Sequence, residues 1–267
     1  MADKWPTRLD PRMAETDDEG AGPDDAADGS RSSTDRVGPF DFDDVTVVMG
    51  TYDEAAAIGT VLADVDRVTD GRARVVCVDG SRDRTPEIAR EHGATVIEQE
   101  PRGYGVAVAR GLREAERPVV VTSDCDDTYP MEALPRLLEL VNDGADVVSC
   151  DRLYHGAEAM PRLNRLGNGL FALGASTLLG TRVHDVTTGM RAYRREVIES
   201  IDWTENTGLS AELLLRPAMR GYRVVETPVE YRERAGETTL DPLAGGAAIG
   251  YSIAKVCAEE HLRRVTG

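Results

Sequence analysis

The sequence predicts an α/β protein whose sheet is doubly wound and mostly parallel. Between residues 45 and 151, short apolar runs rich in valine alternate with longer segments of helical periodicity. Such alternation is typical of βαβ units, in which right-handed crossovers place helices on both faces of the sheet. Polar residues directly follow several of these runs, at the strand ends where sheets of this kind bind their ligands.

The first half of the chain supplies the regular alternation. Runs rich in β-branched residues predict strands at 45–49, 73–78, 94–99, 118–123 and 145–151. Helical spacing of apolar residues predicts helices at 55–68, 85–93, 105–116 and 131–144. The helix at 85–93 has a proline near its start and a glycine at its end, as helices commonly do.

The second half of the chain is less regular. A long amphipathic helix is expected at 160–180, a loop that enters a strand at 185–197, and a further helix at 209–222. A strand interrupted by proline follows at 223–234, and a helix rich in small residues occupies 242–265.

The charge balance is strongly acidic. With 48 acidic and 31 basic residues among 267, the formal net charge is −17. Nearly all the cations are arginines, since Lys4 and Lys255 are the only lysines. Such a surface suits high salt, where counter-ions screen self-repulsion over short distances, so we expect a halophilic source. The acidity disfavours a nucleic-acid binder, which needs a basic face.

Composition divides the chain into three parts. Residues 1–42 are rich in Asp, Glu, Gly, Pro and Ser, which predicts a disordered acidic tail. Residues 43–240 form the expected α/β domain, and 241–267 a C-terminal helix suited to a peripheral position at a membrane. The chain has neither an apolar signal core nor a run of 18 apolar residues, so we expect a cytoplasmic protein without a transmembrane helix.

The cysteines give no sign of a metal site or a disulfide framework. None of the four, Cys77, Cys125, Cys150 and Cys257, stands in a CxxC motif. We expect them to be small buried side chains in a reducing cytosol.

Three carboxylates crowd the end of the expected strand at 118–123, namely Asp124, Asp126 and Asp127. Like charges this close resist one another's ionisation, whereas a divalent cation favours closely spaced oxygens. Mg²⁺ and Mn²⁺ commonly bind one or two carboxylates and complete their shell with phosphate oxygens and water. A metal that bridges the protein to a diphosphate is one interpretation. The alternative is a solvated turn before a helix, with Asp126, Asp127 or Thr128 as its N-cap.

Two other strand ends carry polar side chains. Asp79 can accept hydrogen bonds from a nucleobase or ribose, and Tyr52 and Glu54 can flank the same base. Asp79 can equally serve as a turn former before Gly80. Because parallel strands end at one edge of the sheet, the three polar ends together predict a nucleotide pocket with a metal at its diphosphate end.

These motifs resemble those of inverting family-2 glycosyltransferases, which have the nucleotide-diphospho-sugar transferase (GT-A, Rossmann-like) fold. Within that family the best match is to the dolichyl- and polyprenyl-phosphate hexose (mannose or glucose) synthases of haloarchaeal type. The resemblance covers about 45–240 and rests on GTYDE at 50–54, VDGSRDRT at 78–85, RGYGVAVARG at 102–111 and DCDDTYP at 124–130. Val78 replaces the family's first Asp, Cys125 its Ala and Tyr129 its His.

The resemblance implies that 43–240 is the catalytic domain and assigns roles to its residues. The implied nucleotide-sugar contacts are Thr51, Tyr52, Glu54, Cys77, Asp79, Gly103, Asp124 and Cys125. The implied metal ligands are Asp124 and Asp126, with Thr128 as a further ligand. Catalytic roles fall to Asp126, Arg152 and Arg234, with Arg152 approaching the donor phosphates.

The second half of the chain agrees with this family. DVTTGMRAYRREV at 185–197 matches its D-x-T-G-x-R-x-Y-R-(R/K)-E-V motif, and RAGETTL at 234–240 matches its closing R-x-G-x-S-K-L loop. In that loop, which would fold over the donor, Thr239 stands where the family has lysine.

The expected acceptor is a phosphate, which is already an anionic nucleophile and needs cations rather than a general base. Arginine forks suit phosphate, and the expected contacts are Arg162, Arg165, Asn168 and Arg191. A solvated face is the alternative for these arginines. A hydroxyl acceptor would need a base, for which Glu212 is the candidate; otherwise Glu212 complements a helix dipole or pairs with an arginine.

Apolar residues on the helix at 160–180 have two interpretations. Either they pack in the core, which we favour, or they face a membrane and the polyprenyl chain. The residues are Met160, Leu163, Leu166, Leu170 and Phe171.

The sequence thus predicts a hexosyltransferase that depends on Mg²⁺ or Mn²⁺. It would move a hexose from a UDP- or GDP-linked sugar to dolichyl (polyprenyl) phosphate, as a peripheral protein at the inner face of the cell membrane. Two alternatives stay open: the same fold acting on a hydroxyl acceptor with Glu212 as base, and a nucleotide-sugar-binding protein without turnover.

Overall fold

The computed structural model describes residues 39–156, 158–233 and 242–266. The expected tail therefore lies outside the described residues except for 39–42, and Arg234 and Thr239 also lie outside them. Within the described part, Phe40 already packs against the core, and the side chain of Asn142 binds both its N–H and its C=O.

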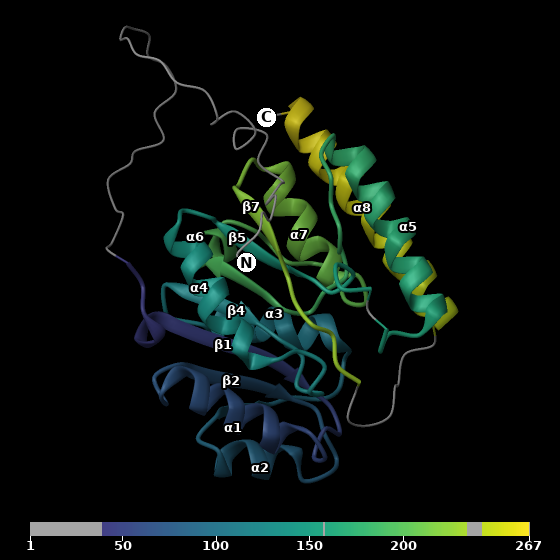
Figure 1. Ribbon diagram of the computed structural model, residues 1–267. Helices are drawn as coiled ribbons and strands as arrows, with labels where there is room; N and C mark the ends of the chain where they lie inside the picture. Colours follow the sequence, from purple (N-terminus) through teal and green to yellow (C-terminus); the bar gives the residue numbers. More distant parts are fainter. Residues whose placement is uncertain (1–38, 157, 234–241, 267) are drawn as a thin grey trace, which may run out of the picture.

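One sheet organises the described residues, with strand order β3-β2-β1-β4-β6-β5-β7 (Figure 1). The strands are β1 Val45–Thr51, β2 Arg74–Asp79, β3 Thr95–Glu98, β4 Val119–Thr122, β5 Val147–Asp151, β6 Arg191–Arg194 and β7 Val224–Pro228. Neighbours pair in parallel except at β6, which is antiparallel to both β4 and β5. The predicted mostly parallel, doubly wound sheet is thus confirmed.

Helices cover both faces of the sheet (Figure 1). On one face lie α1 Ile58–Thr69, α2 Thr85–Glu91 and α4 Leu134–Asn142, with the 3-10 turns η2 Phe42–Asp44 and η3 Met131–Ala133. On the other lie α3 Tyr104–Glu114, α6 Arg195–Glu199 and α7 Leu209–Met219. Two further helices, α5 Arg162–Leu179 and α8 Pro242–Thr266, lie side by side outside α7.

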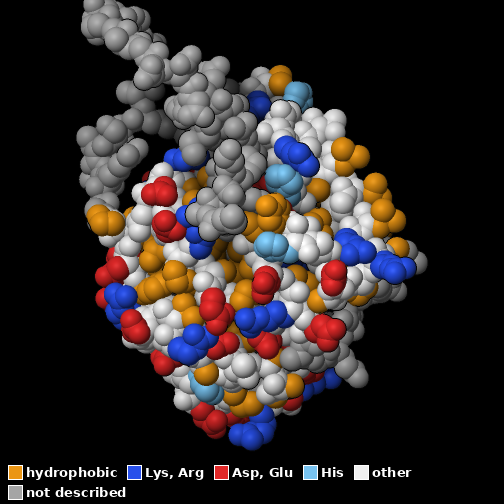
Figure 2. Space-filling view, in the orientation of Figure 1, with side chains coloured by type: hydrophobic (Ala, Val, Ile, Leu, Met, Phe, Trp, Pro, Cys, Tyr) orange, Lys and Arg blue, Asp and Glu red, His pale blue; other side chains and the backbone are white. Residues whose placement is uncertain are grey.

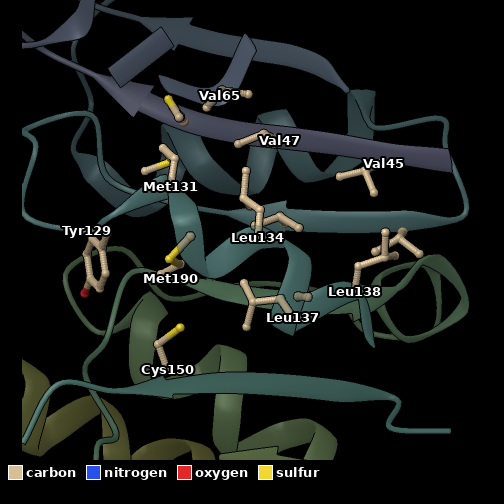
Figure 3. Packing of buried hydrophobic residues seen from close by; sticks show 14 of the residues in the cluster. Val45, Val47, Val65, Tyr129, Met131, Leu134, Leu137, Leu138, Cys150 and Met190 are labelled. Carbon is tan, nitrogen blue, oxygen red and sulfur yellow. The ribbon is translucent and has the colours of Figure 1, made fainter. Parts of the chain in front are cut away.

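Alternating side chains of the buried strands build a core on each face. In β1, Val45 and Val47 join the cluster under α1 and α4, whereas Val48 joins the cluster on the α3 side. This period of two is the geometry of a strand buried on both sides, which explains why its sequence is a continuous apolar run. Figure 3 shows Leu134 and Leu137 of α4 lying between β1 and Cys150 of β5.

The antiparallel strand β6 is the main departure from the regular alternation. The sequence predicted a loop entering a strand at 185–197, and β6 is that strand, inserted between β4 and β5. Arg191 at its start stands opposite Thr122 of β4 and Ser149 of β5. Because β6 runs in the opposite direction, the residues before it lie at the carboxyl ends of its two neighbours.

The expected core position of the apolar residues on α5 is wrong for three of them. Leu163, Leu166 and Leu170 are 54%, 64% and 60% exposed, whereas Met160 is buried and Phe171 is partly buried. The reason is that α5 rests on α7 and α8 rather than on the sheet, so its leucines point outward. Figure 2 shows hydrophobic side chains along the right-hand edge of the molecule, where α5 lies in Figure 1.

We call Leu163, Leu166, Leu170 and Leu173 the leucine stripe. No described helix has the length and apolar character needed to cross a membrane. All four cysteines are free and buried, as expected from their spacing.

Candidate functional site

The predicted site residues of β1, β2 and β4 converge on one edge of the sheet. Thr51 at the end of β1 stands in register with Asp79 at the end of β2. On the other side of β1, Thr122 of β4 stands opposite Val48, so Asp124 follows at the same edge. The carboxylates after β4 and the polar pair at β1 and β2 therefore lie at the same edge of the sheet.

Asp79 is held rigidly at the end of β2. Its side chain is 2% exposed and accepts hydrogen bonds from the hydroxyls of Thr51, at 2.7 Å, and Ser81, at 2.6 Å. The Ser81 N–H donates to it as well, at 3.1 Å. Asp79 thus closes the turn before Gly80, which is the structural role the sequence allowed.

The loop after β1 presents one exposed ring and one buried carboxylate. Tyr52 is 40% exposed, whereas Glu54 is 9% exposed. Between them Asp53 adopts a left-handed backbone with φ of 55°, and its carboxylate accepts a hydrogen bond from the Arg82 N–H. Asp and Asn tolerate this conformation better than most residues, and the loops after β1 and β2 are thereby tied together.

Asp124 lies against the loop that precedes β6. A Cβ atom added to Gly189 would lie 2.4 Å from a carboxylate oxygen of Asp124, so no side chain fits between them. From the other side, Tyr104 at the start of α3 forms a hydrogen bond with Asp124. Although 37% of Tyr104 is exposed, its hydroxyl is shielded from water, and this desolvation together with the negative charge of Asp124 raises the pKa of Tyr104.

Asp126 is fixed by the residue two positions later. The N–H and the hydroxyl of Thr128 both donate to its Oδ1, at 3.2 and 2.6 Å. This is the side-chain turn that the alternative interpretation expected. Asp126 is nevertheless only 5% exposed, so this turn holds a buried carboxylate rather than the solvated one that the alternative expected.

The site is electrically negative. Burial raises the pKa of Tyr231, and the charges of Asp126 and Asp124 raise it further, against the opposing effect of Arg152. Burial also raises the pKa of Cys125, and Glu54 is the largest charged contributor. Glu54, Asp126 and Asp124 thus place negative charge around Cys125, although no three ligating side chains among the described residues gather closely enough to hold a metal ion by themselves.

Arg152, at the end of β5, is neutralised by Asp185. Its guanidinium binds both carboxylate oxygens, with Nε–Oδ2 of 2.6 Å and NH2–Oδ1 of 2.8 Å. The same NH2 group donates to the Thr187 hydroxyl at 2.8 Å, and the guanidinium stacks 5.4 Å from the centre of the Tyr231 ring. Two parallel hydrogen bonds of this kind orient an arginine strongly, so the Arg152 guanidinium is held in one position.

The residues expected to hold the acceptor phosphate separate into two groups. Arg162 and Arg165 line a groove of about 420 Å³ on α5 together with Leu166, Gly169 and Leu170. Asn168 lies on the same helix, and its Oδ1 accepts a hydrogen bond from the Thr187 hydroxyl at 2.8 Å. Asn168 therefore connects α5 to Arg152 through Thr187.

Arg191 lies elsewhere, in the sheet, with no exposed surface. Its Nε donates to Ser149 at 2.9 Å and its NH2 to the Val186 carbonyl at 2.7 Å. Because β6 lies between β4 and β5, the structure does not bring Arg191 together with the three expected acceptor residues on α5.

Two other candidates are also fully buried. Cys77 has no exposed surface and packs in the core, because it lies two residues inside β2. Glu212 is likewise fully buried and accepts hydrogen bonds from Arg216, at 2.7 Å, and from the N–H groups of Thr204 and Glu205. Glu212 is thus the partner of an arginine, which disfavours it as a general base.

Sequence reasoning missed several residues at the site. Tyr104, Asp185, Gly189 and Tyr231 all touch or surround the predicted residues. Asp185 and Gly189 stand in the quoted 185–197 motif, and Tyr104 stands in the glycine-rich 102–111 motif. The two motifs could have indicated that their residues belong to the site. The spacing within each motif does not show which of its residues contact the carboxylates.

Comparisons with known proteins agree with this geometry. The family described as Glycosyl transferase family 2 matches residues 46–202. A dolichyl-phosphate hexose transferase of Haloferax volcanii is 71% identical over 224 residues, covering 84% of this chain and 98% of that protein. A dolichol-phosphate mannosyltransferase of Pyrococcus furiosus is 30% identical over 210 residues, covering 73% of this chain and 59% of that protein.

A solved structure shares the fold. Glucosyl-3-phosphoglycerate synthase from Mycobacterium tuberculosis, in complex with Mn²⁺, UDP and glucosyl-3-phosphoglycerate, matches with a TM-score of 0.69 at 21% identity. The match covers 80% of this chain and 80% of that chain. The expected nucleotide-diphospho-sugar transferase (GT-A) fold is therefore confirmed.

Proposed function

Because the chain belongs to glycosyltransferase family 2, we propose that it transfers a hexose from a nucleotide-diphospho-sugar to dolichyl (polyprenyl) phosphate with inversion. The observation that carries the proposal is the shared sheet edge, where Asp124 and Asp126 follow β4 beside the Thr51–Asp79 pair. The name of the Haloferax relative supports the lipid-phosphate acceptor. The proposed donor is UDP- or GDP-linked.

In this proposal Asp124 and Asp126 hold Mg²⁺ or Mn²⁺ together with the donor diphosphate. The pair fits such an ion, because both carboxylates lie near enough to Tyr231 to raise its pKa together, and one or two carboxylates suffice when phosphate oxygens complete the shell. The Thr128 hydroxyl donates to Asp126 and so orients it. When bound, the metal supplies charge neutralisation for the leaving diphosphate. The Mn²⁺ and UDP in the mycobacterial structure support this assignment.

The donor nucleoside would lie over β1 and β2. Tyr52 offers an exposed ring for a base, and the Asp79 carboxylate offers acceptor oxygens at the strand end. Asp185 holds the Arg152 guanidinium in place and largely balances its charge. Such a group is suited to orienting a bound phosphate rather than to attracting one from a distance.

The acceptor would approach along α5. The groove on α5 places Arg162 and Arg165 beside Leu166 and Leu170, an arrangement that matches a phosphate joined to an apolar chain. A phosphate nucleophile needs no general base, and the burial of Glu212 favours such an acceptor over a hydroxyl. We accordingly propose a peripheral position at the cytoplasmic face of the membrane, with the leucine stripe toward the lipid.

The test is a matched pair of variants. Asp126→Asn should lower the transfer of labelled hexose to dolichyl phosphate by about 100-fold or more, since a metal contributes several kcal/mol to the transition state. Asp127→Asn should keep near-normal turnover, because Asp127 is half-buried with φ of 62°, a conformation that asparagine adopts readily.

Turnover in molar KCl with UDP- and GDP-sugars, with and without Mg²⁺ or Mn²⁺, is the measurement. Equal turnover of the two variants would refute the metal role. Label that enters a water-soluble product rather than the lipid phase would replace the phosphate acceptor with a hydroxyl acceptor. Nucleotide-sugar binding without any turnover would identify a binding protein.

A further inference from the structure

The segment before α7 is wedged into the glycine-rich loop before α3. A Cβ atom added to Gly105 would lie 2.3 Å from the carbonyl oxygen of Asn206, and one added to Gly103 would lie 2.5 Å from its side-chain amide. Gly103 also has a φ of 105°, a conformation that other residues rarely adopt. The two glycines therefore allow the backbone to approach Asn206 at van der Waals distance.

Asn206 bridges this loop with both ends of its amide. Its Oδ1 accepts a hydrogen bond from the Gly105 N–H at 3.1 Å, and its Nδ2 donates to the Arg102 carbonyl at 2.8 Å. The partners are separated by about 100 residues in sequence, since they are 101 and 104 positions from Asn206. One side chain thus fixes both flanks of a short loop.

The residue between those flanks reaches the candidate metal site. Tyr104 lies between Arg102 and Gly105, and it forms a hydrogen bond with Asp124. Any shift of the loop therefore moves a direct neighbour of Asp124.

The segment that carries Asn206 is itself anchored to α8. The Glu205 carboxylate accepts hydrogen bonds from Ser252 and from Lys255, the latter at 2.7 Å. A Cβ atom added to Gly208 would lie 2.1 Å from the Ser252 Cβ, so the segment also packs tightly against that helix. These contacts make Asn206 a fixed point rather than a mobile loop residue.

We propose that Asn206 is a positioning residue of the donor site, which holds the 102–105 loop so that Tyr104 stays against Asp124. The inference rests on the proposed function, because it assigns Asp124 to the metal and diphosphate. Asn206 touches neither of these itself and acts through the loop.

The experiment compares Asn206→Ala with Asn142→Ala in the full chain. Asn142 is the matched control, since it is also an exposed residue and also bridges a backbone N–H and C=O, those of Phe40, at 2.8 and 3.0 Å. Calorimetric titration with UDP and GDP in the presence of Mn²⁺ gives the affinity, and thermal unfolding gives the stability. We expect Asn206→Ala to weaken nucleotide binding about tenfold, as the loss of two hydrogen bonds allows, and Asn142→Ala to leave it unchanged.

A double-mutant cycle tests the route through Tyr104. If Asn206 acts through that residue, the effects of Asn206→Ala and Tyr104→Phe on nucleotide affinity will be less than additive. In turnover, Asn206→Ala should raise the KM for the donor and leave the KM for the lipid phosphate unchanged.

The outcomes separate the inference from the proposed function. Wild-type protein that binds neither UDP nor GDP with Mn²⁺ overturns the proposed function, and the inference with it. Wild-type binding with an unchanged affinity in Asn206→Ala overturns the inference alone. So does an equal loss of affinity in Asn142→Ala, which would make the effect one of general stability.

Discussion

Gly189 and Asp124 are in contact across the sheet edge, and the contact leaves no room for a side chain on Gly189. A Cβ atom there would lie 2.4 Å from one carboxylate oxygen of Asp124. The backbone of Gly189 cannot retreat freely, because its N–H donates to the Tyr129 hydroxyl at 2.8 Å and its carbonyl accepts from Thr122 at 2.8 Å. The loop before β6 therefore determines where the Asp124 carboxylate lies.

Gly189→Ala should displace the Asp124 carboxylate and lower turnover by about 100-fold, the scale expected for a misplacement of about 1 Å at a reacting centre. Gly174→Ala is the control, since nothing lies within 4 Å of its added Cβ on α5. Turnover and Mn²⁺ affinity check the prediction, with circular dichroism to confirm folding. Equal activity in the two variants would show that Asp124 does not need this position.

The Gly189 contact illustrates what the sequence could and could not predict. Each parallel strand carries its own valine-rich run, so β1, β2 and β4 were predictable one by one, and their shared edge followed from the topology rule. The proximity of Gly189 to Asp124 depends on the insertion of β6 between β4 and β5. Local periodicity does not encode which strands become neighbours.

The leucine stripe was ambiguous for a different reason. A helix with one apolar face has the same 3.6-residue pattern whether that face meets the core or solvent. Whether the leucines are buried depends on which face of α5 packs against the rest of the protein. The buried residues of α5 are the small residues Ala172 and Ala175. The long leucines therefore stay outside, which composition alone did not indicate.

Asp151 should give the folded protein an unusual pH dependence. Burial, together with the negative charge of Glu226, raises the pKa of Asp151 from 3.8 to about 6. Between these two values the folded state binds more protons than the unfolded state, so this residue makes stability fall as pH rises from about 4 to about 6. Asp151→Asn removes the effect and keeps an acceptor for the Leu153 N–H.

At pH 7, Asp151→Asn should be more stable than wild type by about 2–3 kcal/mol, from roughly two pKa units at about 1.4 kcal/mol each. Below about pH 4 the two proteins should be equally stable. Denaturant unfolding at several pH values measures this, with Asp143→Asn on the surface as the control. A difference between the proteins that does not change with pH would contradict the prediction.

Arg216 should be far more important for stability than an exposed arginine. It is 5% exposed and binds Glu212, Glu260 and Glu259 at 2.7, 2.9 and 2.6 Å, which joins α7 to α8. Arg216→Met leaves two buried carboxylates without this partner and should cost about 3–5 kcal/mol of unfolding free energy.

Arg195→Met is the matched control for Arg216→Met. Arg195 also binds a glutamate at 2.6 Å, but that side chain is 40% exposed and its partner Glu199 is 58% exposed. Its loss should cost less than about 1 kcal/mol. Thermal and denaturant unfolding compare the variants, and a similar cost for both would show that the α7–α8 network contributes no more than a surface pair.

The leucine stripe should mediate binding to lipid. Each leucine that enters the bilayer contributes about 1.5–3 kcal/mol, so Leu163→Asp with Leu173→Asp, the two stripe residues outside the acceptor groove, should abolish co-sedimentation with vesicles. In molar KCl the charge effects are screened, which leaves the apolar contribution dominant in spite of the net charge of −17. Because the two side chains are 54% and 65% exposed, the variant should unfold at the wild-type temperature.

Leu262→Asp separates the stripe from surface hydrophobicity in general. Leu262 is 61% exposed but lies on α8, outside the stripe, so this variant should sediment with vesicles as wild type does. Transfer to a water-soluble, short-chain polyprenyl phosphate should survive in the stripe variant, since its arginines and carboxylates are unchanged. If that transfer is lost as well, the leucines serve the acceptor groove itself rather than the membrane.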